Sequence, residues 1–118
     1  MSYGVHIERS NGDDKLSLEE WLNYVSSDSE MNLIGKAAAT SPKGDIVQYE
    51  APGMTQWTDP RTGEKALFDC RRNRISVGNP SRETIIKMFS VAKALRAVVT
   101  GDEGERYDAE GNACSPGQ

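Results

Sequence analysis

The sequence predicts an α+β fold, a two-layer sandwich in which two helices pack on one face of an antiparallel sheet of about five strands. Residues 17–28 and 79–97 carry apolar side chains at the three- and four-residue steps of a helix. Before and between them lie short strand-like segments divided by turn residues. This order of a strand, a helix, a run of strands and a second helix is typical of α+β domains.

The first strand is predicted over residues 3–8, where apolar side chains alternate with others. Tyr3, Val5 and Ile7 share one face, so His6 points to the other side, toward solvent or a second face. A polar turn is predicted next, over residues 9–15.

The first helix begins at Ser17, whose side chain is placed to cap the backbone N–H of Glu20. The Glu20 carboxylate can reach back to the N–H of Ser17, which completes a capping box. Leu16 before the cap and Trp21 after it are spaced to form a hydrophobic staple. The apolar stripe stops at residues 26–28, where we expect the helix to end.

The middle of the chain is predicted to be an antiparallel meander. Turns rich in Pro, Gly and Asn separate strand segments at 32–40, 46–50, 54–58, 64–70 and 74–77. The first of these segments is a weak strand, because its three alanines can pack little surface.

The second helix is predicted to begin with Asn79 as its cap and Pro80 in the first helical position. Its apolar residues recur at steps of three and four, so it covers much of the core. We place its end near Ala97. In the alternative, the β-branched residues 98–100 form a last strand that pairs with residues 105–107.

A chain of 118 residues is long enough for one core, and we place a single domain over residues 1–108. Residues 109–118 are predicted to be a flexible C-terminal tail. No apolar run approaches the roughly 20 residues that span a bilayer, and residues 1–9 lack the apolar stretch of a signal peptide. Two cysteines are too few for a disulfide framework, so we expect a cytoplasmic protein without membrane contact.

The net charge is concentrated in residues 101–112. Five acids and one base there give the same net charge, −4, as the whole chain, so the remaining residues are neutral in sum. An acidic segment on a neutral body predicts a protein partner with a basic surface. Asp102, Glu103 and Glu105 are the candidate contacts, with Tyr107 as an amphipathic neighbour. The alternative is a solvated loop.

Two further sets of residues are candidates for binding. Trp57 is a candidate anchor for the partner if it is exposed, and packing within the sheet is its alternative. Arg71, Arg72 and Arg74 form one basic cluster that can touch phosphates at a hairpin tip. Because the pI is near 5, we do not expect nucleic acid as a partner.

The sequence offers no pattern of catalytic residues. His6 is the single histidine, and the sequence places no nucleophile and acid to work with it. Cys70 shares a strand face with apolar residues, which favours a packed thiol, although neighbouring arginines leave activation as an alternative. One histidine and two distant cysteines give no zinc spacing, and the acidic segment does not fit an EF-hand loop. We predict no catalytic residue, metal or cofactor.

Three stretches carry a resemblance to known proteins: LSLEEWLNYVSSD at 16–28, RISVGNP at 74–80, and AKALRAVV to GDEGERYD within 92–108. They resemble a group of small, uncharacterised bacterial proteins with a similar LEEW helix and a closing GDEGE-type turn. The resemblance covers most of the chain through Asp108. Members of this group look like the immunity proteins found beside secreted bacterial toxins. The resemblance therefore implies an immunity-like function and supplies no catalytic residues.

Together these observations predict a non-catalytic protein that binds and occludes one cognate protein, such as a bacterial toxin or effector. A small enzyme that uses Glu8, Cys70 or His6 in a cleft is one alternative. A self-associating structural protein is the other. The sequence leaves the choice between monomer and homodimer open.

Overall fold

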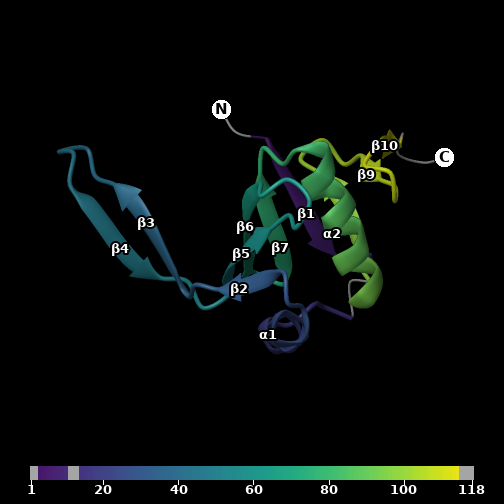
Figure 1. Cartoon of the computed structure of the whole chain (residues 1–118), viewed down its shortest axis with the longest axis horizontal. Coiled ribbons are helices and arrows are strands. Elements are labelled where there is room, and N and C mark those ends of the chain that lie inside the picture. The colour runs from purple at the N-terminus through teal and green to yellow at the C-terminus, as the bar shows by residue number, and fades with distance from the viewer. Residues whose placement is uncertain (1–2, 11–13, 115–118) are drawn as a thin grey trace.

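The computed structural model describes residues 3–10 and 14–114. Within these ranges it is an α+β fold with two helices and antiparallel strands, as the sequence predicts (Figure 1). The elements are β1 (Gly4–Glu8), α1 (Leu18–Ser27), β2 (Met31–Leu33), β3 (Lys36–Thr40), β4 (Ile46–Glu50), β5 (Met54–Thr58), β6 (Lys65–Arg71), β7 (Arg74–Gly78), α2 (Arg82–Ala94), β8 (Val98–Gly101), β9 (Arg106–Tyr107) and β10 (Ala113–Cys114).

The main sheet of this structure has eight strands in the order β10-β9-β8-β1-β7-β6-β5-β2, so the prediction of about five strands was wrong. Two causes account for the difference. Residues 98–114 add three strands at one edge, because β8 pairs with β1, β9 with β8 and β10 with β9. At the other edge, the segment predicted as one strand over 32–40 divides, and its first part pairs with β5. β3 and β4 form a separate two-stranded sheet.

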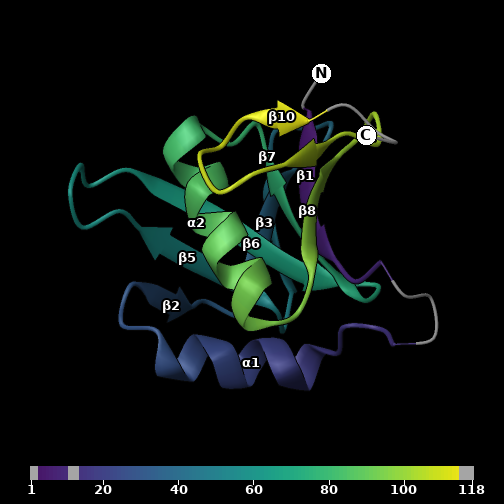
Figure 2. The same cartoon turned by 90° about the vertical axis from the view of Figure 1, so that its right-hand side faces the viewer.

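The inner face of the main sheet and both helices enclose one hydrophobic core. Val5 lies opposite Val77 and Ile7 opposite Ile75, so the alternation predicted for β1 is confirmed on this face. Figure 2 shows α2 across the sheet and α1 below β2. The core members from the helices and their flanks are Leu16, Trp21, Val25, Met88, Val91, Ala92 and Leu95.

The N-terminus of α1 has the predicted geometry. The Glu20 N–H donates to Ser17 Oγ at 3.1 Å, and the Ser17 N–H donates to Glu20 Oε1 at 3.3 Å, which confirms the capping box. Leu16 and Trp21, the two residues of the predicted staple, are both fully buried. The first helix is therefore specified by signals that lie within a few residues of each other.

The predicted cap of α2 was wrong. Ser81 caps this helix by accepting from the Thr84 N–H, and Asn79 instead accepts from the Tyr3 N–H at 2.8 Å. The helix also ends earlier than Ala97, because Arg96 has a φ of 57° and breaks the helical path. Residues 98–101 then join β1 as β8, which confirms the alternative of a last strand that pairs with residues 105–107.

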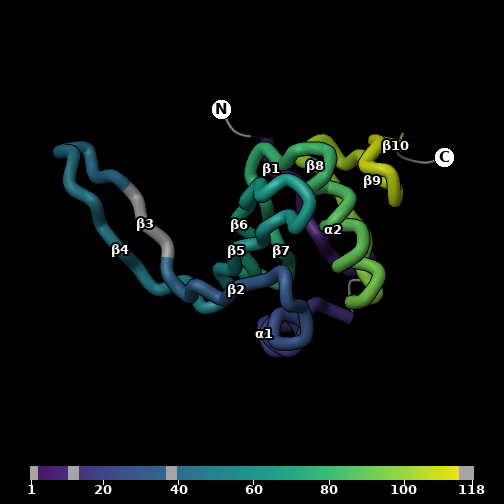
Figure 3. Tube along the Cα trace, viewed as in Figure 1, coloured from purple at the N-terminus to yellow at the C-terminus, as the bar shows by residue number. Residues whose placement is uncertain are grey.

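The hairpin of β3 and β4 leaves the main sheet as a projecting arm, defined here as residues 36–50 (Figures 1 and 3). Gly35, which has a φ of +72°, separates β2 from β3, and this left-handed conformation turns the chain out of the sheet. Lys36 pairs with Glu50 at the base of the arm and Thr40 with Ile46 near its tip.

Parts of two predicted segments fall outside the described residues. These are residues 11–13 of the polar turn and residues 115–118 of the C-terminal tail. Of the rest of that tail, Ala113–Cys114 pair with β9 as β10. In the described part of the chain, neither helix is long and apolar enough to cross a membrane.

Candidate protein-binding surfaces

Asp102, the first of the predicted acidic contacts, binds its own chain. Its carboxylate accepts from the Gly4 N–H at 2.7 Å and lies 2.7 Å from Nε2 of His6. The hydrogen bond with His6, followed by the one with Gly4, lowers the pKa of Asp102. The carboxylate therefore fastens the turn after β8 to strand β1.

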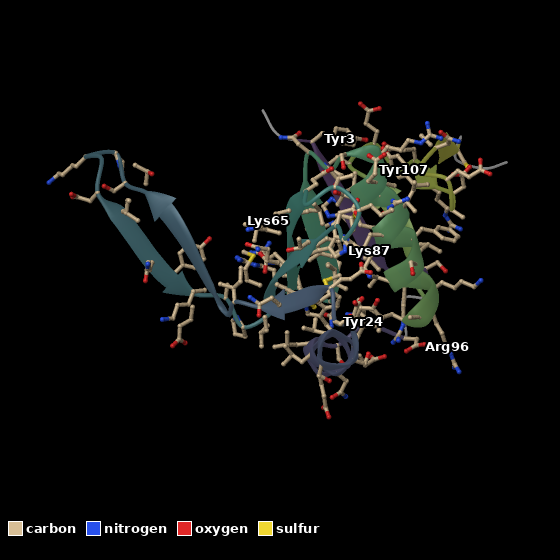
Figure 4. The ribbon with its side chains drawn as sticks, in the orientation of Figure 1. Tyr3, Tyr24, Lys65, Lys87, Arg96 and Tyr107 are labelled. Atoms are coloured by element: carbon tan, nitrogen blue, oxygen red, sulfur yellow. The ribbon has the colours of Figure 1, made fainter. Side chains whose placement is uncertain are left out.

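Glu105, the third of these acids, is also used internally. It accepts hydrogen bonds from the hydroxyl of Tyr3 and, at 2.9 Å, from that of Tyr107. Figure 4 labels these two tyrosines, in the upper part of the view. Burial alone would raise the pKa of Glu105, but hydrogen bonds from Tyr3, from the backbone and from Tyr107 together outweigh it and lower the pKa. Burial, together with the Glu105 carboxylate, raises the pKa of Tyr107 to about 12.

The five predicted contact residues therefore do not form one exposed surface. Asp102 and Glu103 are both exposed, although the Asp102 carboxylate also accepts from the Gly4 N–H of β1. Glu105 is half-buried and is held by the Tyr3 hydroxyl. Trp57 is 3% exposed and donates its indole N–H to Glu30 at 2.9 Å, so it is a core residue and not a surface anchor. Tyr107 is half-buried and lines a pocket of about 390 Å³ between α2 and β8.

The Glu105→Gln variant is expected to lose about 1 kcal/mol of its free energy of unfolding, because a neutral amide accepts weaker hydrogen bonds than a carboxylate. Glu103→Gln is the matched control and is expected to leave the stability unchanged, since Glu103 is exposed. Urea denaturation of the two variants beside the wild type measures the difference. Equal midpoints for the two variants would contradict an internal role of Glu105.

The pH dependence of stability follows from the same contacts. The pKa of Asp102 and that of Glu105 are lower in the folded chain than in the unfolded chain. Their contribution is therefore complete above the unfolded values, at about pH 4, and is lost as the pH falls through the folded values. Urea denaturation at pH 7 and at pH 3 should show that the loss in free energy of unfolding caused by Glu105→Gln is smaller at the lower pH.

The structure brings a serine and an aspartate to the single histidine. Nδ1 of His6 lies 2.7 Å from Oγ of Ser76, and Nε2 lies 2.7 Å from Oδ1 of Asp102. These are the residue types of a catalytic triad. However, His6 and Ser76 lie on β1 and β7, two interior strands whose N–H groups are engaged by their neighbours and not offered to an oxyanion. The arrangement therefore joins β1, β7 and the turn after β8.

The residues named for the enzyme alternative lie on opposite faces of the sheet. Cys70 is 5% exposed within the core, and burial raises the pKa of its thiol to about 11. His6 and Glu8 share the face of β1 that is turned away from the core, where His6 is 7% exposed and Glu8 accepts from the Thr100 hydroxyl. A site that combines Cys70 with His6 or Glu8 is therefore excluded by the geometry. Among the described residues, no group of three or more His, Cys, Asp or Glu side chains is placed to hold a metal ion.

The strongest candidate surface was not predicted from the sequence. Seven large apolar side chains are exposed in the described residues, and five of them lie in the arm or lead into it. Ile46 is 75% exposed, Val47 51% and Tyr49 44%, while Leu33 and Ile34 precede the arm. The sequence signal is the Ile-Val pair of β4, which breaks the strict alternation of a half-buried strand and places an apolar side chain on each face.

Comparison of the chain with protein-family models, with curated proteins and with solved structures finds no match to any of them.

Proposed function

We propose that this chain is a non-catalytic protein-binding protein whose contact surface is the arm. The observation that carries the proposal is the exposure of Ile46, Val47 and Tyr49 on a hairpin that stands away from the main sheet. A two-stranded hairpin is at best marginally stable in water without further packing. Val47 and Tyr49 lie next to each other on one face of β4 and Ile46 lies on the other, and exposed apolar residues grouped in this way are typical of a surface that another protein covers.

The partner of the proposal is a cognate protein that the chain occludes, such as a bacterial toxin or effector. The resemblance to small bacterial proteins of the immunity type supports this class of partner. Val47 and Tyr49 share one face of β4 and are available for packing against that partner. The proposal places the chain in the cytoplasm, which two free thiols support.

The arm predicts a different salt dependence from that of the acidic segment. Residues 36–50 contain two lysines, one aspartate and one glutamate, so the arm is neutral. Apolar contacts of a neutral arm should persist as the salt concentration rises. Contacts of Glu103 and its acidic neighbours with a basic partner should instead weaken. This second mode, a basic partner on the acidic segment, is the alternative.

Affinity capture from a lysate of the source organism tests the proposal with four baits. The first two baits are the wild type and Val47→Lys, which places a charge on the arm. The third bait, Leu18→Lys, is the control and places the same charge at an exposed apolar position on α1. Glu103→Gln/Glu110→Gln neutralises two exposed acids. We expect one stoichiometric protein on every bait except Val47→Lys, at both low and high salt.

Three outcomes would contradict the proposal. They are equal retention by Val47→Lys and the wild type, selective loss on the double-glutamine bait, and an empty wild-type bait. The second outcome would assign the binding to the acidic segment. Because Val47 is half exposed, its replacement should not unfold the chain, and circular dichroism of each bait checks this.

A further inference from the structure

We infer that the edge of β4 pairs with β4 of a second copy of this chain, so that two arms form one four-stranded sheet in a homodimer. The inference rests on the proposed function and names the partner of the arm's edge. It leaves the face that carries Val47 and Tyr49 free for the cognate protein, because strand pairing uses backbone groups and not side-chain faces.

The edge of β4 is open to pairing. β3 pairs with β4 along one side, and all five residues of β4 are exposed. Natural edge strands are commonly protected by lysine, proline or a bulge. The strand IVQYE contains neither lysine nor proline, whereas β3 begins with Lys36. The sequence therefore leaves the β4 edge less protected than the β3 edge.

A two-fold axis at Gln48 gives the antiparallel register that uses the whole strand. Gln48 then faces its own counterpart, and Val47 faces Tyr49 of the second copy, in two equivalent pairs. Directly opposite residues lie on the same face of a sheet, so this register builds one continuous apolar face from both copies. The resulting sheet has four strands, which exceeds the roughly three strands that a sheet with an apolar face needs to be stable on its own.

The distribution of charge favours a second copy as the occupant of this edge. The whole net charge of −4 belongs to residues 101–112, and the rest of the chain is neutral in sum. Figure 1 shows β9 and β10 at the opposite end of the molecule from the arm. Two copies that meet through their arms therefore keep their acidic segments apart and bring neutral surfaces together.

Sedimentation of charge variants at Gln48 tests the inference. Gln48→Lys places two like charges opposite each other at the axis, and Gln48→Glu does the same with negative charges. We expect the wild type to sediment as a dimer. We expect the dimer dissociation constant of each variant to be about fivefold higher than that of the wild type. An equimolar mixture of the two variants should recover the dimer, because opposite charges then face each other. Asn23→Lys, an exposed change on α1, is the control and should behave as the wild type.

A wild type that sediments as a monomer at every concentration would overturn the inference. So would a Gln48→Lys variant that behaves like Asn23→Lys, or a mixture that dissociates as its components do. These results are distinguishable from a failure of the proposed function. If the chain is a monomer and Val47→Lys abolishes the capture of a protein, the proposed function stands and the dimer is wrong. If substitutions at Gln48 dissociate a dimer but Val47→Lys does not change the capture, the dimer stands and the proposed function is wrong.

Discussion

The Gly53→Ala variant is expected to lose about 3 kcal/mol of its free energy of unfolding. A methyl group at Gly53 would lie 2.4 Å from the backbone oxygen of Cys70 and 2.8 Å from its Cβ. Both atoms belong to β6 at the edge of the core, so neither can move away as a flexible side chain would. The Gly53 carbonyl also accepts the indole N–H of Trp21 at 2.9 Å, and a backbone shift would disturb this bond.

Urea denaturation of Gly53→Ala beside Gly78→Ala measures this effect. A Cβ at Gly78 would meet no atom within 4 Å, and its backbone is not left-handed, so the control should keep wild-type stability. Equal midpoints for the two variants would show that β5 and β6 are not packed as closely as the structure has them.

The Lys87→Met variant is expected to have the second large effect, a loss of about 3 kcal/mol. Nζ of Lys87 lies 2.8 Å from Oδ2 of Asp28 and 3.0 Å from Oε1 of Glu30. The side chains of Lys87 and Asp28 are 13% and 11% exposed and that of Glu30 is 34% exposed. Removal of the amine therefore leaves the nearly buried Asp28 carboxylate close to that of Glu30 without a cation between them. The same carboxylates accept from the Tyr24 hydroxyl and from the Trp57 indole, which ties α2 to the region after α1.

Lys93→Met is the matched control, because Lys93 is exposed on the same helix. The deficit of Lys87→Met at pH 7 should shrink as the pH falls, since protonation of Asp28 and Glu30 removes the repulsion that the substitution exposes. Thermal denaturation of both variants at two pH values tests this. A deficit that is equal for the two lysines would contradict the role of the buried cluster.

The elements that could be predicted are those whose signals are local. Ser17 and Glu20 lie three residues apart and specify the start of α1 by themselves. The cap of α2 is Ser81, two residues after the predicted cap Asn79. The side chain of Asn79 does not cap the helix, because it accepts a hydrogen bond from the N–H of Tyr3, 76 positions away. No local sequence pattern can show such a contact.

The candidate site shows the same limit. The sequence identifies the acidic segment correctly as the source of the net charge, but the partners of Asp102 and Glu105 are Gly4, His6 and Tyr3 at the other end of the chain. The two strands of the arm were predicted as part of the meander. The turn at Gly35 determines whether they join the main sheet or leave it, and the strand pattern does not show this.

Amide hydrogen exchange of β4 tests the central claim, that another protein chain covers the arm. We expect the amides of residues 46–50 to exchange rapidly in the dilute free chain and at least about tenfold more slowly in the captured complex. The amides of β7, which lies between β1 and β6, should exchange equally slowly in both states and serve as the internal reference. Protection confined to residues 101–112, with β4 unchanged, would contradict the claim and return the binding surface to the acidic segment.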